Sequence, residues 1–144
     1  MKNTLEISYL ILICTFNLLF IQQASAQCNL EDWQVLQTLY VETDGANWMN
    51  NTGWDQVDPA LHPISPPADC DLGMLHGITV DGSGNVVGID LPSNHLHGLI
   101  PEELGSMTNL TSLQLNDNHL QGGIPASFSG LSNLTVFNVS NNML

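Results

Sequence analysis

The second half of the chain repeats one pattern of apolar and polar positions every 24 residues. Equivalent apolar positions are Val86, Leu110 and Leu134; Ile89, Leu113 and Phe137; Leu91, Leu115 and Val139; and Leu96, Leu120 and Leu144. Self-similarity at a fixed period is typical of architectures in which each coil has too little apolar surface to fold alone and must stack on its neighbours.

Each part of the unit predicts a local structure. The alternation in Ile89, Asp90 and Leu91 predicts a short strand with its apolar side chains inward. An asparagine follows each strand, and its amide can pair with backbone groups that the turning chain leaves unbonded. These asparagines, Asn94, Asn118 and Asn142, are predicted to form a ladder. Residues 101–108 predict one short helical turn on the outer side.

The unit reads LxxLxLxxNxLxGxIPxxLxxLxx and resembles the plant-type extracellular leucine-rich repeat, which carries the GxIP motif. The resemblance covers residues 86–144. It implies an α/β repeat fold, a right-handed solenoid with short parallel strands on its concave face and a helical N-terminal cap. It also implies a non-enzymatic binding scaffold of the kind found in receptor-like protein ectodomains.

Upstream of the repeats, the pattern predicts a helix and a turn. Asn29 can cap a helix over residues 30–43 that ends at Asp44-Gly45. The tryptophan-containing stretch that follows resembles the N-terminal cap of the same family, so we expect a cap at residues 27–85 and repeats at residues 86–144, two complete and a third truncated. Residues 81–85 have the composition of a hairpin turn, which we favour over a calcium loop.

The N-terminus resembles a secretory leader. A 13-residue apolar run from Tyr9 to Ile21 precedes the small residues Ala24-Ser25-Ala26, which predicts a signal peptide at residues 1–26. We therefore expect a secreted, extracellular protein that does not insert into a membrane after signal removal. Cys28 and Cys70 then remain and most simply form a disulfide, with a lipidated Cys28 as the alternative.

Charge and motifs restrict the function. The chain has 14 Asp and Glu residues and a single Lys or Arg, Lys2, which leaves with the leader. Without cations the mature chain cannot neutralise phosphates, so we exclude a nucleic-acid partner. It carries no recognised catalytic motif, and we expect no enzyme activity, no catalytic residue, no cofactor and no metal. His95, His97 and His119 are interpreted as exposed loop residues rather than metal ligands.

The resemblance implies a ligand on the concave face. By register, the candidate binding residues are Asp90, Ser112, Gln114, Asn116, Asp117, Asn138 and Ser140. Their amides, hydroxyls and carboxylates suit a protein, peptide or glycan better than an anion. The alternative function is a structural extracellular, cell-wall or matrix protein, including an ice-binding type.

Two further expectations concern modification and assembly. Asparagine sequons predict glycans at Asn50, Asn109, Asn133 and Asn138. The sequence stops at Leu144 inside a third coil, which predicts either an N-terminal fragment of a longer receptor-like protein or self-association through an open C-terminal end.

Overall fold

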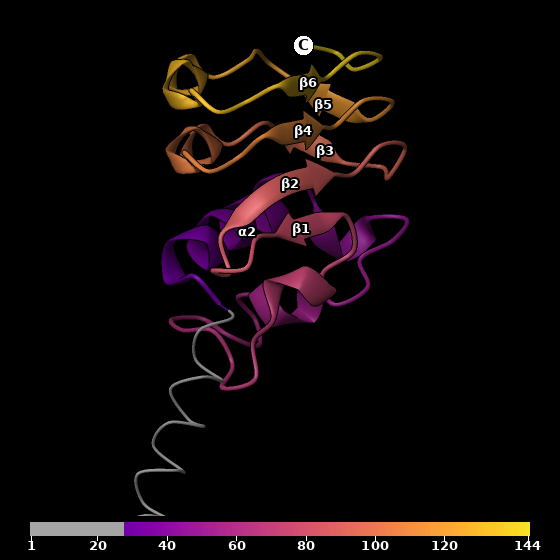
Figure 1. Cartoon of the computed structure of the whole chain (residues 1–144). Coiled ribbons are helices and arrows are strands. Elements are labelled where there is room, and N and C mark those ends of the chain that lie inside the picture. Colours follow the sequence, from indigo (N-terminus) through magenta and orange to yellow (C-terminus); the bar gives the residue numbers. More distant parts are fainter. Residues whose placement is uncertain (1–27) are drawn as a thin grey trace, which may run out of the picture.

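The computed structural model describes residues 28–144, which form a stack of coils on an N-terminal helical segment (Figure 1). That segment contains helix α2 (Leu30–Glu42) and three short 3-10 helices, η1 (Gly45–Asn47), η2 (Trp54–Val57) and η3 (Leu72–Met74). The predicted leader at residues 1–26 lies outside the described residues. Within residues 28–144, every helix is too short or too polar to cross a bilayer.

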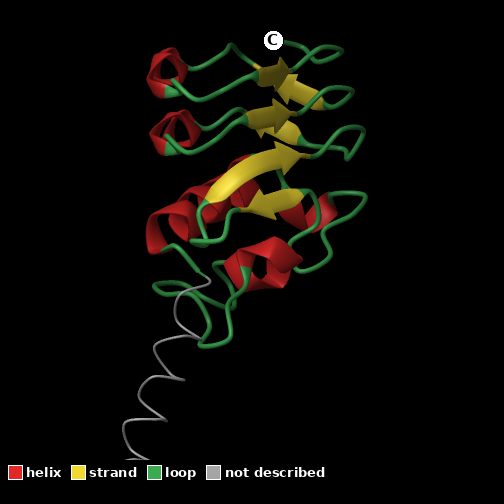
Figure 2. Cartoon of the chain, in the orientation of Figure 1, coloured by secondary structure: helices red, strands yellow, loops and turns green. Residues whose placement is uncertain are grey.

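The main sheet is mixed. It has the strand order β1-β2-β4-β6, formed by β1 (Ile78–Val80), β2 (Val86–Asp90), β4 (Ser112–Gln114) and β6 (Val136–Asn138) (Figure 2). The strands β2, β4 and β6 are parallel, as the repeat predicts. The sheet is mixed because the turn at residues 81–85 folds β1 back antiparallel to β2, as the hairpin composition of that turn predicts.

A second sheet lies across the coils and pairs β3 (His97–Leu99) in parallel with β5 (His119–Gln121). The short helices η4 (Glu102–Ser106) and η5 (Ala126–Gly130) form the predicted outer turns and stack one above the other (Figure 1). The β3–β5 register places His97 beside His119, whereas the 24-residue repeat makes His95 its equivalent. The left-handed backbone of His95, with φ of 60°, turns it out of the strand.

One hydrophobic core runs through the N-terminal segment and the coils. Helix α2 contributes Trp33, Leu36 and Leu39, and the first two repeats contribute their inward residues, all nearly inaccessible to solvent. The equivalent residues of the third repeat are partly buried or exposed. Trp48 and Trp54 meet edge to face with ring centroids 4.6 Å apart. Each indole N–H has a backbone acceptor, which removes the cost of burying it: Trp33 donates to Gln56, Trp48 to Thr43 and Trp54 to His76.

Helix α2 begins as the sequence predicts and ends in a different way. Asn29 caps the helix by accepting the N–H groups of Glu31 and Asp32. At the other end, the left-handed residue is Asp44, with φ of 61°, and not Gly45. Glycine is needed at 45 for space, because a Cβ there would lie 2.0 Å from the Tyr40 ring.

The N-terminal segment is joined covalently and by a buried carboxylate. A disulfide links Cys28 to Cys70, with their Cα atoms 5.6 Å apart. This bond uses the Cys28 sulfur and is incompatible with the lipidated alternative. Asp32, only 7% exposed, accepts the N–H of Val86 at 2.7 Å and so ties α2 to the first coil. Burial raises the pKa of Asp32 above its usual value.

The asparagines that follow the strands hold successive coils together. Asn118 Oδ1 accepts the N–H groups of Asn94 and Leu96 at 2.9 and 3.0 Å. Its Nδ2 donates to the carbonyls of Leu91 and Leu115 at 2.8 and 3.0 Å. One side chain therefore satisfies backbone groups of two coils.

The same arrangement continues on both sides of Asn118. Asn142 accepts the N–H of Leu120 and donates to the Leu115 carbonyl. Asn94 accepts the N–H of Asn50 at 2.7 Å and donates to its carbonyl at 3.0 Å. The N-terminal segment thus supplies the backbone groups with which the asparagine ladder begins, on the N-terminal side of the first coil.

We expect Asn118→Leu to lower the free energy of unfolding by about 3 kcal/mol or more, since each buried backbone group left without a partner costs about 1 to 3 kcal/mol. The matched variant Asn142→Leu should cost less, because Asn142 is only partly buried. Urea unfolding of both variants measures the difference. Equal losses would contradict the role assigned to Asn118 as the central rung.

Asp32 supplies a pH-dependent prediction. Because its pKa is raised in the folded chain, the stabilisation from this carboxyl is complete below its ordinary pKa of 3.8 and is lost as pH rises through the folded value. Asp32→Asn keeps an acceptor for the Val86 N–H without a buried charge. We expect it to be more stable than the native chain at pH 7, with the gain disappearing below pH 3.8.

Asp32→Leu is the control, because it leaves the Val86 N–H without an acceptor. It should lose about 1 to 3 kcal/mol at every pH. Thermal unfolding at several pH values follows all three proteins. An Asp32→Asn loss at pH 7 as large as that of Asp32→Leu would show that the carboxylate charge itself is needed.

Candidate ligand-binding surface

The outward face of the mixed sheet gathers side chains that lie one repeat apart in the sequence. Register pairing aligns Asp90, Gln114 and Asn138 in one row across β2, β4 and β6. A second row contains Gly88, Ser112 and Val136. The side chains vary from coil to coil, so the surface offers a different group at each step.

The first of these rows has unused hydrogen-bonding capacity. Within residues 28–144, the side chains of Asp90 and Gln114 have no hydrogen-bond partner, and Asp90 is exposed. The Oδ1 atom of Asn138 accepts both the N–H and the hydroxyl of Ser140, at 3.2 and 2.8 Å. The row therefore presents a carboxylate and a primary amide whose donors and acceptors are free for a ligand.

Asp117 is engaged within the protein. Its two carboxylate oxygens accept hydrogen bonds from the Nδ2 atoms of Asn116 and Asn141, each at 2.6 Å. Those bonds hold the pKa of Asp117 below its usual value. Asn141 belongs to the next coil, so the predicted binding residue Asp117 links two coils, while Asn116 supports it from the same coil.

The loop position of Asp117 requires an unusual backbone. Ser93, Asp117 and Asn141 occupy the same place in successive repeats and have φ of 50°, 59° and 56°. Short polar side chains tolerate this left-handed conformation because they can hydrogen-bond locally. The repeated backbone keeps the loop shape constant at the rim of the sheet.

The histidines lie away from this face, on and beside the second sheet. The rings of His97 and His119 stack with centroids 4.6 Å apart, and His95 lies 5.9 Å from His119. All three are exposed. No group of three or more His, Cys, Asp or Glu side chains in the described part of the chain is arranged to hold a metal ion.

The four sequons differ in their surroundings. Asn109 is exposed, whereas the exposed Asn133 donates through Nδ2 to the Thr108 carbonyl at 2.8 Å. Asn50 accepts the Thr52 hydroxyl at 2.8 Å and is partly buried. Asn138 lies in the row of the concave face, where a glycan would obstruct a ligand.

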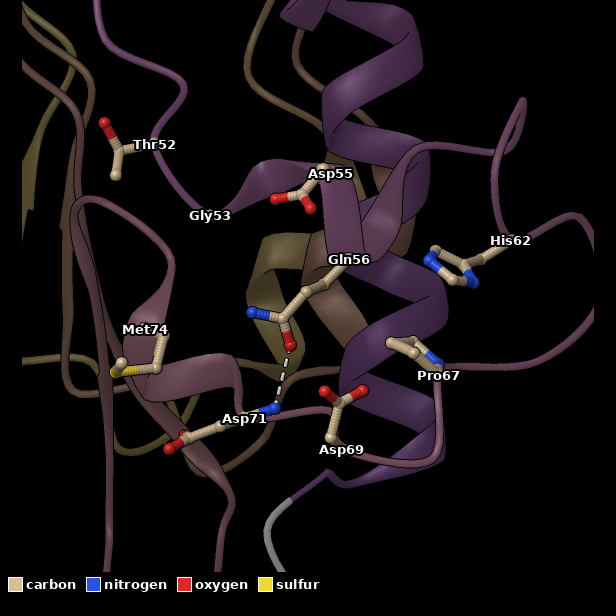
Figure 3. A pocket seen from close by; sticks show the side chains of 9 residues that line it. All are labelled: Thr52, Gly53, Asp55, Gln56, His62, Pro67, Asp69, Asp71 and Met74. Carbon is tan, nitrogen blue, oxygen red and sulfur yellow. Dashed lines mark hydrogen bonds between the residues drawn. The ribbon is translucent and has the colours of Figure 1, made fainter.

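A cavity of about 720 Å³ beside η2 was not predicted from the sequence (Figure 3). It is lined by Asp55, Asp69, Asp71 and His62 among others, and Gln56 Oε1 accepts the Asp71 N–H at 2.8 Å. The proline-rich composition of residues 56–67 indicates only an irregular surface segment. Nothing in its composition indicates that it folds back over η2.

Comparison with known proteins decides the family. A model described as a leucine-rich repeat matches residues 73–144, half of the chain. The chain belongs to the leucine-rich repeat family. The coils, the strand register and the asparagine ladder described above are therefore the leucine-rich repeat fold of this chain. No curated protein sequence gives a significant match.

Solved structures similar to this leucine-rich repeat chain share its fold. The ectodomain of the receptor kinase SOBIR1 from Arabidopsis thaliana superposes with a TM-score of 0.56 at 19% identity, covering 81% of this chain. A plant ice-binding protein gives a TM-score of 0.51 at 20% identity, again over 81% of this chain. The aligned parts are 56% and 42% of those two chains, so this chain spans about half the length of each.

Proposed function

We propose that this chain is a secreted, non-enzymatic binding module that recognises a protein, peptide or glycan on the concave face of its sheet. The observation that supports the proposal is the row of Asp90, Gln114 and Asn138, aligned by strand register across β2, β4 and β6. Such a row presents several hydrogen-bonding groups at fixed spacing, and pre-organised groups bind with a smaller loss of conformational entropy.

The chemistry of the face favours a neutral polar ligand. The rows contain amides, a hydroxyl and a carboxylate, and the sequence after Lys2 has no lysine or arginine. Amides and carboxylates pair with sugar hydroxyls or with the backbone of an uncharged peptide. A phosphorylated or nucleic-acid ligand would meet repulsion from an uncompensated acidic surface.

The N-terminal segment acts as a cap in this proposal, and the solenoid winds to the right. Helix α2 and the residues up to Asn85 cover apolar surface that the first coil would otherwise expose. Parallel strands joined by a crossover are right-handed in nearly all proteins, which supports that hand for the β2–β4–β6 coils. Residues 27–85 would then be the cap and residues 86–144 the binding repeats.

Secretion and glycosylation complete the proposal. The disulfide between Cys28 and Cys70 supports folding in an oxidising compartment, as expected after removal of residues 1–26. Glycans at Asn50, Asn109 and Asn133 would leave the concave row free. Self-association is also proposed, through Val136 and Phe137 of β6, which are 44% and 41% exposed, and the solution mass of the purified chain tests it.

A structural or ice-binding function is the second candidate, supported by the plant ice-binding protein among the similar folds. Ice binding requires a flat array of identical groups repeated along one face. The concave rows change their side chain at every coil, which favours ligand recognition instead. A thermal-hysteresis measurement separates the two functions.

The test of the proposed site begins with glycan and protein arrays probed with the mature chain. For the ligand so found, we expect Gln114→Ala to weaken binding about tenfold, since lost ligand hydrogen bonds cost about 1.4 kcal/mol. The matched control is Gln121→Ala, which removes the same side chain from the second sheet and should leave affinity unchanged. Equal effects of the two variants, measured by calorimetry, would place the ligand elsewhere.

A further inference from the structure

A second recess lies on the flank of the solenoid, away from the concave face. It has a volume of about 410 Å³ and is formed where α2, the end of β3, η4 and the start of η5 meet. Its apolar floor contains Leu99, Pro101 and Pro125. Three glutamates, Glu42, Glu102 and Glu103, also line the recess, and we call them its rim. We call the recess the flank groove.

The residues that give the flank groove its character are not required by the repeat. Leu99 stands where the next coil has Gly123, and it is 55% exposed although it is a large aliphatic side chain. Glu102 and Glu103 stand where that coil has Ala126 and Ser127. The fold accommodates small residues at all three positions in the second coil, so Leu99 of the floor and the two glutamates of η4 are special to the first.

The carboxylates of the rim have no cation to neutralise them. The sequence from residue 28 onward contains no lysine or arginine, and all three glutamates are exposed. Glu42 is also the last residue of α2, whose final turn contains no basic residue. A negative charge there is unfavourable, because it adds to the negative end of the helix dipole. The groove therefore combines an apolar surface with an uncompensated negative potential.

We propose that the flank groove docks a basic segment of a partner protein. An arginine or lysine has an aliphatic stem that packs on apolar surface and a charged head that stays in water, which matches an apolar floor inside an acidic rim. The stem would lie on Leu99 and the two prolines, and the head would reach the glutamates. This contact is independent of the concave-face proposal and gives the chain a second interaction surface.

The test uses the full mature chain and a blocked pentapeptide in which two arginines flank one leucine, observed by NMR chemical-shift mapping and titration at low salt. We expect shifts centred on Leu99 and the η4 turn. The double variant Glu102→Ala/Glu103→Ser introduces the side chains of the next coil and should weaken binding at least fivefold. Leu99→Gly, also taken from the next coil, should weaken it by removing the floor.

Two controls separate this site from general attraction to an acidic protein. Asp55→Asn/Asp69→Asn removes the same number of charges in the other cavity and should change affinity less than twofold. A matched peptide with glutamines in place of arginines should not bind. Absence of binding by the arginine peptide, shifts spread over the whole surface, or an equal loss in both double variants would overturn the proposal.

Discussion

The structure depends on how the backbone groups at each bend of the coil find partners. A coil that turns away from its strand buries N–H and carbonyl groups where water cannot reach them, and each would be costly if left unpaired. Asn118 satisfies groups of two coils at once, and the Asn94 side chain pairs with both backbone groups of Asn50 in the N-terminal segment. The asparagine ladder thus fixes the spacing of the coils, and the apolar core fills the space between them.

Backbone groups at the junction with the N-terminal segment also find hydrogen-bond partners, but from residues that lie outside the repeat. That segment has no repeat of its own, yet the backbone of Asn50 pairs with the Asn94 side chain, and Asp32 accepts the N–H of Val86. β1 then covers the side of β2 that faces away from the repeats. A sheet held in this way at one end is rigid, which is why the outward rows on β2, β4 and β6 can present side chains at a constant spacing.

The sequence predicted what local periodicity determines. The inward residues, the ladder asparagines and the parallel register of β2, β4 and β6 all follow from positions 24 residues apart. It missed features that depend on contacts between unlike segments. The position of Asp32 in the sequence indicates only a place in the first turn of its own helix, and the cavity around Asp55 requires a loop whose path no periodicity encodes. The sequence also did not predict that His97 pairs with His119. The reason is that one left-handed residue, His95, breaks the repeat register locally.

The hydrogen bonds between adjacent coils have an evolutionary consequence. Thr111 bonds the Val87 carbonyl and Thr135 bonds the Thr111 carbonyl, as the ladder asparagines repeat their own contacts one unit further on. We call the hydrogen bonds that connect two adjacent coils a joint. The joint formed by one repeat is equivalent to the joint formed by the next. Duplication or deletion of a whole unit within a gene would preserve each joint and alter only the length of the recognition surface. A duplication of any other length would break the joints, so such proteins are expected to diversify in whole units.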